Sequence, residues 1–238
     1  MIDLGEFTLT TLSASKLKTF SSCEKKYYYE YIEKACTDRH PAAALGTSVH
    51  KTIEHVYREQ TDPIATFSEI FGKEIAQYED TGIDLRKYQT DGIKMVRQYN
   101  FARRTPTAME VEFLLPFPNQ AHALCQIRGF IDQTYDWGFV DLKTNRTKPL
   151  NSVLDNDLQF LIYDWAFEQI NGYEARDKIW HQLRTGEDLY ADTVGKLDNV
   201  TRVIERILDS YMTGIYDRSV GDPCRICSHR KACLGRSD

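Results

Sequence analysis

The first hundred residues place apolar side chains at the spacing of α-helices. One stripe begins after Ser13 and Ser15, either of which can cap a helix, and a second stripe follows Gly46. Further helices are expected over 64–78 and 88–103. The stripes consist of Leu17, Phe20, Tyr27, Tyr28 and Tyr31, and of Val49, Ile53, Val56 and Tyr57. This pattern predicts a helical N-terminal region.

Beyond this region, β-capable residues predict three strands, over Thr107–Phe117, Ala123–Tyr135 and Phe139–Lys143. A turn at 136–138 separates the last two. Apolar residues then recur on one helix face, a further strand is expected over Lys178–Leu183, and a helix over 192–212. The apolar helix face carries Leu158, Leu161, Ile162 and Trp165. The order predicts an α/β core packed against the N-terminal helices.

Composition narrows the class of protein. The chain has 238 residues, of which 42% are hydrophobic and 27% charged, as in a globular protein with a sizeable core. It has no apolar run long enough to span a bilayer. The N-terminus lacks the basic and apolar regions of a signal peptide, so we expect a cytoplasmic location. The net charge of −5 counts mildly against nucleic-acid binding, although a metal-dependent nuclease concentrates carboxylates at its site.

The segment from Ile127 to Asn145 carries the strongest candidate chemistry. Asp141 and Lys143 are two apart on a strand and therefore project from one face. A hairpin can bring Asp132 beside them. The carboxylates of Asp132 and Asp141 and the carbonyl of Leu142 are ligands that suit Mg²⁺ or Mn²⁺, and Lys143 can orient or deprotonate water. Taken alone, the same residues also describe an ordinary surface hairpin with an Asp–Lys pair.

Two helical motifs accompany this segment. His50, four residues after Gly46, offers a further metal ligand, and Gly46 can allow close backbone approach. Gln159 and Tyr163 are four apart on a predicted helix, so they share one face. Each motif alone also fits a structural histidine or ordinary surface residues.

The cysteines suggest a second metal site. Cys224, Cys227 and Cys233 form a compact C-terminal cluster, and Cys23 lies far upstream. Three close thiolates need a fourth ligand, for either tetrahedral zinc or a [4Fe–4S] cluster, and Cys23 would join the chain ends. The spacing leaves zinc and iron–sulfur open. The two other cysteines, Cys36 and Cys125, read as ordinary buried thiols.

Together these motifs resemble the RecB-like exonucleases of the PD-(D/E)xK superfamily. The ordered set is G-x₃-H, GFID, D-L-K and Q-x₃-Y, and the resemblance extends from about residue 12 to 234. It implies a site built from His50, Asp132, Asp141 and Lys143, supported by Gln159 and Tyr163. Members often show a V-E pair before GFID; of Glu110 and Glu112, Glu112 after Val111 fits that pair better, without a catalytic role.

The cysteine pattern resembles the iron–sulfur members of this family, the AddB-type helicase–nucleases and the CRISPR-associated RecB-like exonucleases. The resemblance implies a structural [4Fe–4S] cluster on Cys23, Cys224, Cys227 and Cys233. The implied fold is a restriction-endonuclease-like mixed sheet flanked by helices, with the cysteine tail joined to the helical region by the cluster. We expect a single nuclease domain over 1–238: a helical region over 1–105, a catalytic core over 106–220 and a cluster-binding tail over 221–238.

The expected function is Mg²⁺- or Mn²⁺-dependent hydrolysis of DNA from its ends, with single strands as substrate, in recombination, repair or CRISPR-type processing. A homo-oligomer and a recombination or CRISPR partner protein are both open. Two alternatives are a non-catalytic DNA-binding adaptor and a zinc-stapled RNA-processing nuclease. The basic tail is the better candidate for phosphate contact, and the Tyr-rich helix face can contact DNA or form core. The residues are Arg225, His229, Arg230, Lys231 and Arg236 in the tail, and Lys25, Lys26 and Tyr27 to Tyr29 in the helix.

Overall fold

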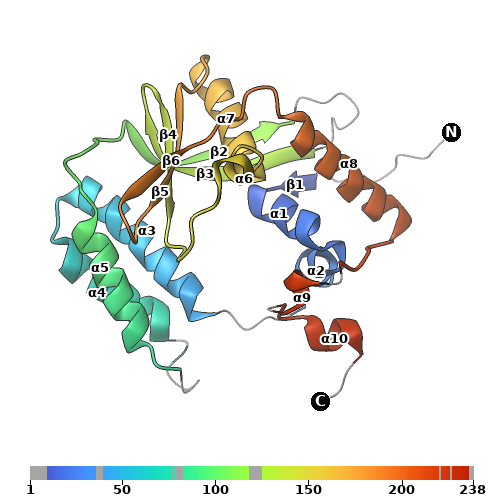
Figure 1. Cartoon of the computed structure of the whole chain (residues 1–238), viewed down its shortest axis with the longest axis horizontal. Helices are drawn as coiled ribbons and strands as arrows, with labels where there is room; N and C mark the ends of the chain where they lie inside the picture. The colour runs from blue at the N-terminus through green and yellow to red at the C-terminus, as the bar shows by residue number, and fades with distance from the viewer. Residues whose placement is uncertain are drawn as a thin grey trace.

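A computed structural model describes residues 10–35, 40–76, 78, 83–117, 125–219, 221–225 and 227–235. Helices dominate the first hundred residues, strands follow, and two short helices end the described chain (Figure 1). The strands are β1 (Thr10–Leu12), β2 (Ala108–Pro116), β3 (Cys125–Tyr135), β4 (Gly138–Lys143), β5 (Asp177–Gln182) and β6 (Glu187–Tyr190). The helices are α1 (Ala14–Ser22), α2 (Glu24–Tyr27), the π-helix η1 (Tyr28–Ile32), α3 (Pro41–Glu59), α4 (Pro63–Ile75), α5 (Arg86–Gln98), α6 (Asn151–Leu154), α7 (Leu158–Asn171), α8 (Asp198–Thr213), α9 (Asp222–Arg225) and α10 (Arg230–Leu234).

The six strands form one mixed sheet in the order β1-β3-β4-β5-β6, with β2 also paired to β3. β2 runs antiparallel to most of β3, from Gln126 to Thr134. β1 pairs in parallel with the start of β3, and β4 pairs antiparallel with its end. β4 continues in parallel with β5, and β6 closes the sheet antiparallel to β5. The predicted mixed α/β fold is therefore confirmed.

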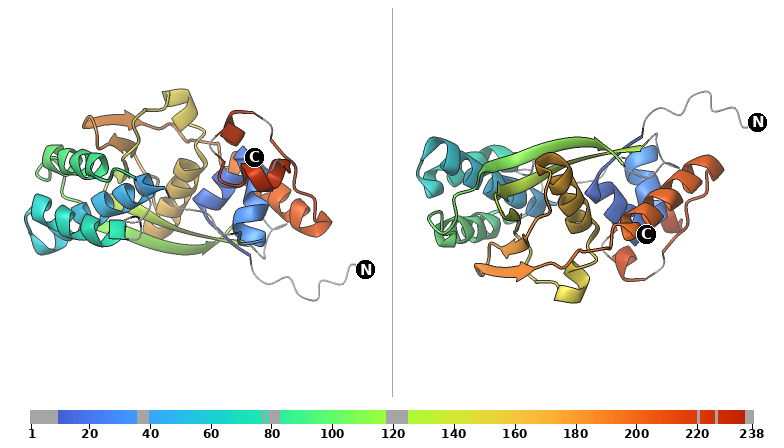
Figure 2. Two further views of the ribbon diagram at one scale, coloured as in Figure 1. Left: turned by 90° about the horizontal axis from the view of Figure 1, so that it is seen from below. Right: turned by 90° about the horizontal axis from the view of Figure 1, so that it is seen from above.

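Two apolar clusters cover the two faces of the sheet. Along β4, Phe139 belongs to the cluster that contains α1, α7 and α8, whereas Val140 and Leu142 belong to the cluster beneath α3, α4 and α5. This alternation follows from the period of two along a strand. Figures 1 and 2 show α4 and α5 at one end of the molecule and α8 and the C-terminal helices at the other. None of the described helices has the length and apolarity needed to cross a membrane.

Local sequence explains the elements that position the site. Ser13 caps α1 by accepting a hydrogen bond from the Lys16 amide, and Asp157 caps α7 through the amide of Gln159. Gly138, between β3 and β4, has a φ of 151°, and a Cβ there would lie 2.0 Å from the Asp177 carbonyl oxygen. The hairpin that carries Asp132 and Asp141 therefore requires glycine at this turn.

Several predicted boundaries differ from the structure. The first stripe is broken at Cys23, whose extended backbone ends α1 before α2 and η1 begin. Gly46 lies inside α3 and not before it, because Pro41 already starts that helix. The helix predicted over 88–103 ends at Gln98, and α8 starts at Asp198 and not at 192. The short strands β1 and β6 were not predicted because three or four residues give too little periodicity to recognise.

Candidate active site

The centre of the site is the fork where β3 and β4 separate. Their pairing runs outward from the hairpin and stops at Gln133 and Val140, one position before Asp132 and Asp141. Asp132 Oδ2 instead accepts a hydrogen bond of 2.6 Å from the amide of Leu142. The carboxylate thus holds the two strands at the fork while it remains close to the side chains of both. This brings Asp132, Asp141 and Lys143 together as the sequence predicted.

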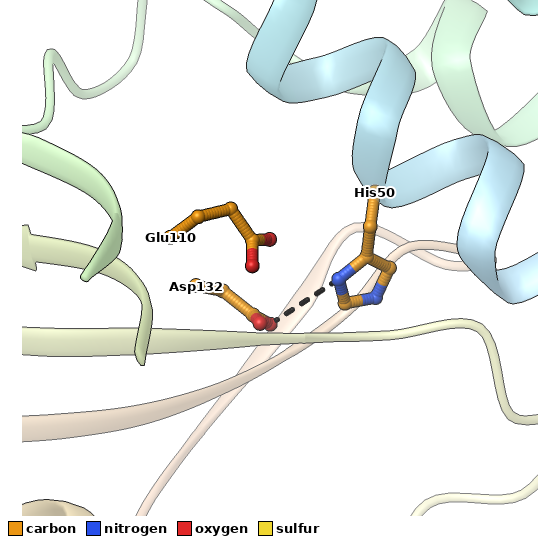
Figure 3. Close-up of side chains that lie close together, drawn as sticks. All are labelled: His50, Glu110 and Asp132. Atoms are coloured by element: carbon orange, nitrogen blue, oxygen red, sulfur yellow. Dashed lines mark ion pairs between the residues drawn. The ribbon is translucent and has the colours of Figure 1, made fainter. Parts of the chain in front are cut away.

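His50 reaches the fork from α3. Its Nδ1 lies 3.5 Å from Asp132 Oδ2. His50, Glu110 and Asp132 each offer one ligand atom, and these atoms all lie within 4.8 Å of one another. Figure 3 shows the imidazole and both carboxylates turned toward a common point. Among the described residues, this is the group of three or more His, Cys, Asp or Glu side chains whose ligand atoms lie this close together. It is therefore the candidate cation site.

Glu110, and not Glu112, is the glutamate at this site. Glu110 occupies the β2 position opposite Asp132, between the paired positions Met109–Gln133 and Val111–Ile131. Its φ of 48° is in the left-handed region, where a non-glycine residue is strained. Glu112 forms an exposed ion pair with Arg128 at 2.6 Å. The sequence motif favours Glu112 for the V-E pair without a catalytic role, whereas the cross-strand register places Glu110 at the site.

A hydrogen-bond network joins β4 to α7 behind the fork. Gln159 Oε1 accepts from Lys143 Nζ at 2.9 Å, and its Nε2 donates to Asp141 Oδ1 at 3.2 Å. The same Nε2 lies 2.9 Å from the hydroxyl of Tyr163. Lys143 Nζ also lies 2.7 Å from Asp141 Oδ2. The i, i+4 pair of α7 thus faces the site, as its spacing predicted, and fixes the orientation of the lysine.

The pKa values of these buried groups are shifted from their usual values. Burial alone would raise the pKa of Asp132, but His50 and Lys143 hold it below its usual value. Burial raises the pKa of Asp141 above its usual value, against the opposing effect of Lys143. Burial and the Asp132 charge raise the pKa of Glu110 to about 7. Burial alone would lower the pKa values of His50 and Lys143, but Asp132 and Asp141 raise both above their usual values, in His50 also against the charge of Lys143. Carboxylates crowded in this way disfavour full ionisation unless a cation joins them.

The donor set fits a hard divalent cation. Three side chains converge with oxygen and imidazole nitrogen atoms, which Mg²⁺ and Mn²⁺ accept as ligands. Asp141 Oδ2 is buried and, although it lies close to Lys143, has no aligned hydrogen bond within the described residues. A buried carboxylate oxygen without an aligned hydrogen bond calls for an explanation, and a bound cation is one. Both observations favour a metal at the fork.

The four cysteines of the predicted cluster line one hollow, although they come from opposite ends of the chain. Cys23, at the end of α1, is buried, and Cys224, Cys227 and Cys233 are half-buried. The amide of Ser219 approaches Cys23 Sγ at 3.5 Å, and Cys224 Sγ donates to the Ser219 carbonyl at 3.2 Å. The structure therefore brings together the residues that the spacing selected. Burial in β3 raises the pKa of Cys125 to about 11, consistent with an ordinary thiol, while Cys36 lies outside the described residues.

Other candidate residues have mixed outcomes. Tyr27 is fully buried and bonds Tyr211, so it belongs to the core. His229 is also buried and stacks on Tyr29, so its expected contact with phosphate is wrong. A Cβ at Gly46 would meet Thr144 Oγ1 only at an ordinary 3.4 Å, so crowding does not explain that glycine. The exposed tail cation Arg230 remains a candidate, and Arg236 lies outside the described residues.

The glycine of GFID, by contrast, has a steric reason. A Cβ at Gly129 would lie 2.4 Å from the ring of Phe113 on β2. The close packing of Phe113 against this strand therefore excludes larger residues beside the site.

Comparison with known proteins agrees with this geometry. A family model described as the PD-(D/E)XK nuclease superfamily matches residues 11–234. The chain has no match among the curated proteins with which it was compared. The matched segment contains the fork, α7 and the four clustered cysteines. Because the match covers nearly the whole sequence, the chain belongs to the PD-(D/E)XK nuclease superfamily.

Proposed function

We propose that the protein is a Mg²⁺- or Mn²⁺-dependent exonuclease that hydrolyses DNA from its ends and prefers single strands. The observation that carries the proposal is the fork, where His50, Glu110 and Asp132 converge beside the Asp141–Lys143 pair. Superfamily membership supports a metal-dependent nuclease. Exonuclease action, DNA as substrate and the choice of metal are the steps that we add, and they rest on the resemblance to RecB-like enzymes.

His50, Glu110, Asp132 and Asp141 would hold the cation, together with the carbonyl of Leu142. A bound divalent ion supplies Lewis acidity and lowers the pKa of water at the phosphate. Lys143 provides the fixed positive charge and the proton donor or acceptor next to this position, because Gln159 and Asp141 restrain its ammonium. Gln159 and Tyr163 act as positioning residues, since their contacts lie behind Lys143 and Asp141.

For the cysteines we propose a structural [4Fe–4S] cluster, with a single zinc ion as the alternative. Tetrahedral zinc with Zn–S bonds of about 2.3 Å needs sulfur atoms about 3.8 Å apart. No three of the four thiols, all of which the structure describes, lie within 4.8 Å of one another, which favours a larger group. The hollow between them is small, about 20 Å³, which favours a single ion. The resemblance to iron–sulfur members decides our choice.

We propose that the chain is one nuclease domain with a helical region, a core and a tail held by the cluster. We place it in the cytoplasm, in recombination, repair or CRISPR-type processing, alone, as a homo-oligomer or with a partner protein. A non-catalytic adaptor is less well supported, because it has no need for a buried Asp141 carboxylate beside an oriented lysine. The zinc-stapled RNA-processing nuclease differs in its substrate and in the metal that the cysteines hold.

Two measurements test the proposal. Linear and circular single-stranded DNA are incubated with Mn²⁺, Mg²⁺ or EDTA, with RNA and duplex DNA in parallel. We expect metal-dependent shortening of the linear strand and an intact circle; nicking of the circle contradicts an exonuclease, and preference for RNA supports the zinc-stapled alternative. Metal analysis of anaerobically purified protein should find iron and acid-labile sulfide in equal amounts. Stoichiometric zinc instead contradicts the cluster.

A further inference from the structure

A gap in the sheet lies directly beside the fork. β2 occupies one edge of β3 from Gln126 to Thr134, so β1 and β4 must share the other edge. β1 covers it up to Ile127, and β4 covers it from Gln133. On this second edge, between β1 and β4, no strand of the described chain pairs with 128–132, a stretch of about 17 Å at 3.4 Å per residue. The gap ends at Asp132, at the site itself.

The gap opens into a hollow of about 510 Å³. Its walls are the start of α1, the open edge of β3 and the face of α7 that carries Gln159 and Tyr163. Both Asp132 and Gln159 line it, so the hollow is continuous with the catalytic fork. A chain that leaves the fork in this direction enters the hollow at once.

The lining combines a cation that lacks an acidic partner with an accessible ring. Lys16 is half-buried, its Nζ donates to the Thr11 carbonyl at 2.7 Å, and no carboxylate pairs with it within the described residues. Phe130 is a phenylalanine at 40% exposure on the hollow's wall, and the Arg128 guanidinium lies 5.4 Å from its ring centre. A cation for phosphate and an aromatic ring for a base are the usual elements of single-strand binding.

A second hollow of about 230 Å³ on the other side of Lys143 provides a contrast. Besides Lys143, two cations line it, but Lys18 pairs with Asp157 and Lys148 pairs with Glu187. Their charge is therefore already neutralised within the protein. The hollow along β3 differs in two ways. It has an exposed aromatic ring, and it has a cation that no carboxylate of the described chain neutralises.

We propose that the hollow along the open edge of β3 binds the unpaired nucleotides that flank the scissile phosphodiester, with Lys16 on a phosphate and Phe130 stacked on a base. Duplex DNA keeps its bases stacked inside, so they cannot reach Phe130. The hollow thereby gives the enzyme its preference for single strands. The inference rests on the proposed nuclease function and adds the surface and residues that select the substrate.

The test separates binding from catalysis. Binding of fluorescent single-stranded and duplex oligonucleotides is measured by anisotropy in a Lys143→Ala background, which prevents cleavage. We expect Lys16→Met with Phe130→Ala to weaken single-strand binding at least about tenfold, with little change for duplex. Lys16→Met alone should also make single-strand binding less sensitive to salt, by the amount expected for the loss of about one phosphate contact. The matched controls, Lys73→Met on α4 and Tyr190→Ala on β6, should leave binding unchanged.

Two further readouts distinguish the ways of failing. An oligonucleotide with 5-iodouracil should photo-crosslink to the peptide that contains Phe130. In the otherwise wild-type enzyme, the ratio of kcat/KM for the oligonucleotide to that for bis(p-nitrophenyl) phosphate should fall at least about tenfold in the double variant. Unchanged single-strand affinity, or crosslinks only elsewhere, overturns the binding surface. If no diester of any kind is cleaved, the proposed function fails, while anisotropy and crosslinking still decide whether the hollow binds DNA.

Discussion

The fork and the cysteine hollow are assembled in opposite ways. At the fork, the adjacent strands β2, β3 and β4 supply the carboxylates and the lysine, and α3 adds His50. Asp132, Asp141 and Lys143 are hydrogen-bonded to the backbone or to Gln159. The cysteine hollow joins α1 to a tail of two short helices across 201 residues, the difference between positions 23 and 224. Ser219 contacts Cys23 and Cys224 there, and the buried His229 stacks on Tyr29 beside them.

This contrast indicates different dependence on the bound group. The fold alone positions the residues at the fork, so we expect the loss of a ligand there to remove the proposed activity and leave the structure intact. The tail has little core of its own. Its two helices, α9 and α10, have only four and five residues, and none of their described side chains is buried. Whatever the cysteines bind should therefore hold the tail in place.

The largest expected effect tests the fork. Asp141→Asn keeps the shape of a residue that is 1% exposed but removes the charge next to Lys143. We expect kcat/KM for DNA to fall by about 100–1,000-fold, because the metal and the lysine lose their shared carboxylate. Circular dichroism should show an intact fold. The control Asp136→Asn, on the exposed hairpin turn, should retain activity; a similar loss there would mean that the hairpin and not the site is being tested.

A smaller effect distinguishes the two glutamates of β2. Glu110→Gln should lower activity about 10–100-fold and shift the metal titration to higher concentration, because one ligand of the converging set loses its charge. Glu112→Gln removes only an exposed pair with Arg128 and should change activity by about twofold or less. Equal effects of the two variants would refute the assignment of Glu110.

The cysteine hollow is tested by proteolysis. Cys233→Ser should abolish the bound metal or cluster and accelerate limited proteolysis after Asp217 about tenfold, because the tail loses its anchor. Metal content and peptide mass spectrometry measure both effects. Cys125→Ala, a buried thiol outside the hollow, provides the control. Full metal content in Cys233→Ser would exclude this cysteine as a ligand.

The smallest effect concerns charge outside both sites. Burial opposes ionisation of Asp188, but His181 and Arg104 lower its pKa to about 2. A depressed carboxyl pKa stabilises the fold above the unfolded value near 4, and this stabilisation is lost as the pH falls through 2. We expect a loss on the order of 1 kcal/mol between these pH values. Urea unfolding should show this loss of unfolding free energy in the wild type and in the control Asp209→Asn, whose side chain is exposed on α8. The loss should be absent in Asp188→Asn.

The sequence predicted which side chains of β4 and α7 lie together at the fork, because each pair is close in the chain. Asp141 and Lys143 share a strand face by period, and Gln159 and Tyr163 share a helix face, so local geometry was sufficient. The predicted strands β2 to β5 agree with the structure within about two residues.

The errors arose where tertiary structure decides. Glu110 became part of the site through its register with Asp132 and an unusual φ, neither of which a strand pattern reveals. His229 was taken for an exposed cation because it lies in a basic run, but stacking on Tyr29 buries it. β1 is too short to recognise, and with it the gap along β3 was invisible in the sequence.

The central claim is that the fork hydrolyses phosphodiester bonds with a metal and Lys143. The most direct measurement incubates end-labelled single-stranded DNA with wild type, Lys143→Ala and the control Lys94→Ala, whose lysine is exposed on α5, in Mn²⁺, Mg²⁺ or EDTA. The account predicts ladder-like shortening by wild type and Lys94→Ala that requires metal and is lost in Lys143→Ala. Cleavage that persists in EDTA or in folded Lys143→Ala, or no cleavage by folded, cofactor-loaded wild type under any metal, would contradict it.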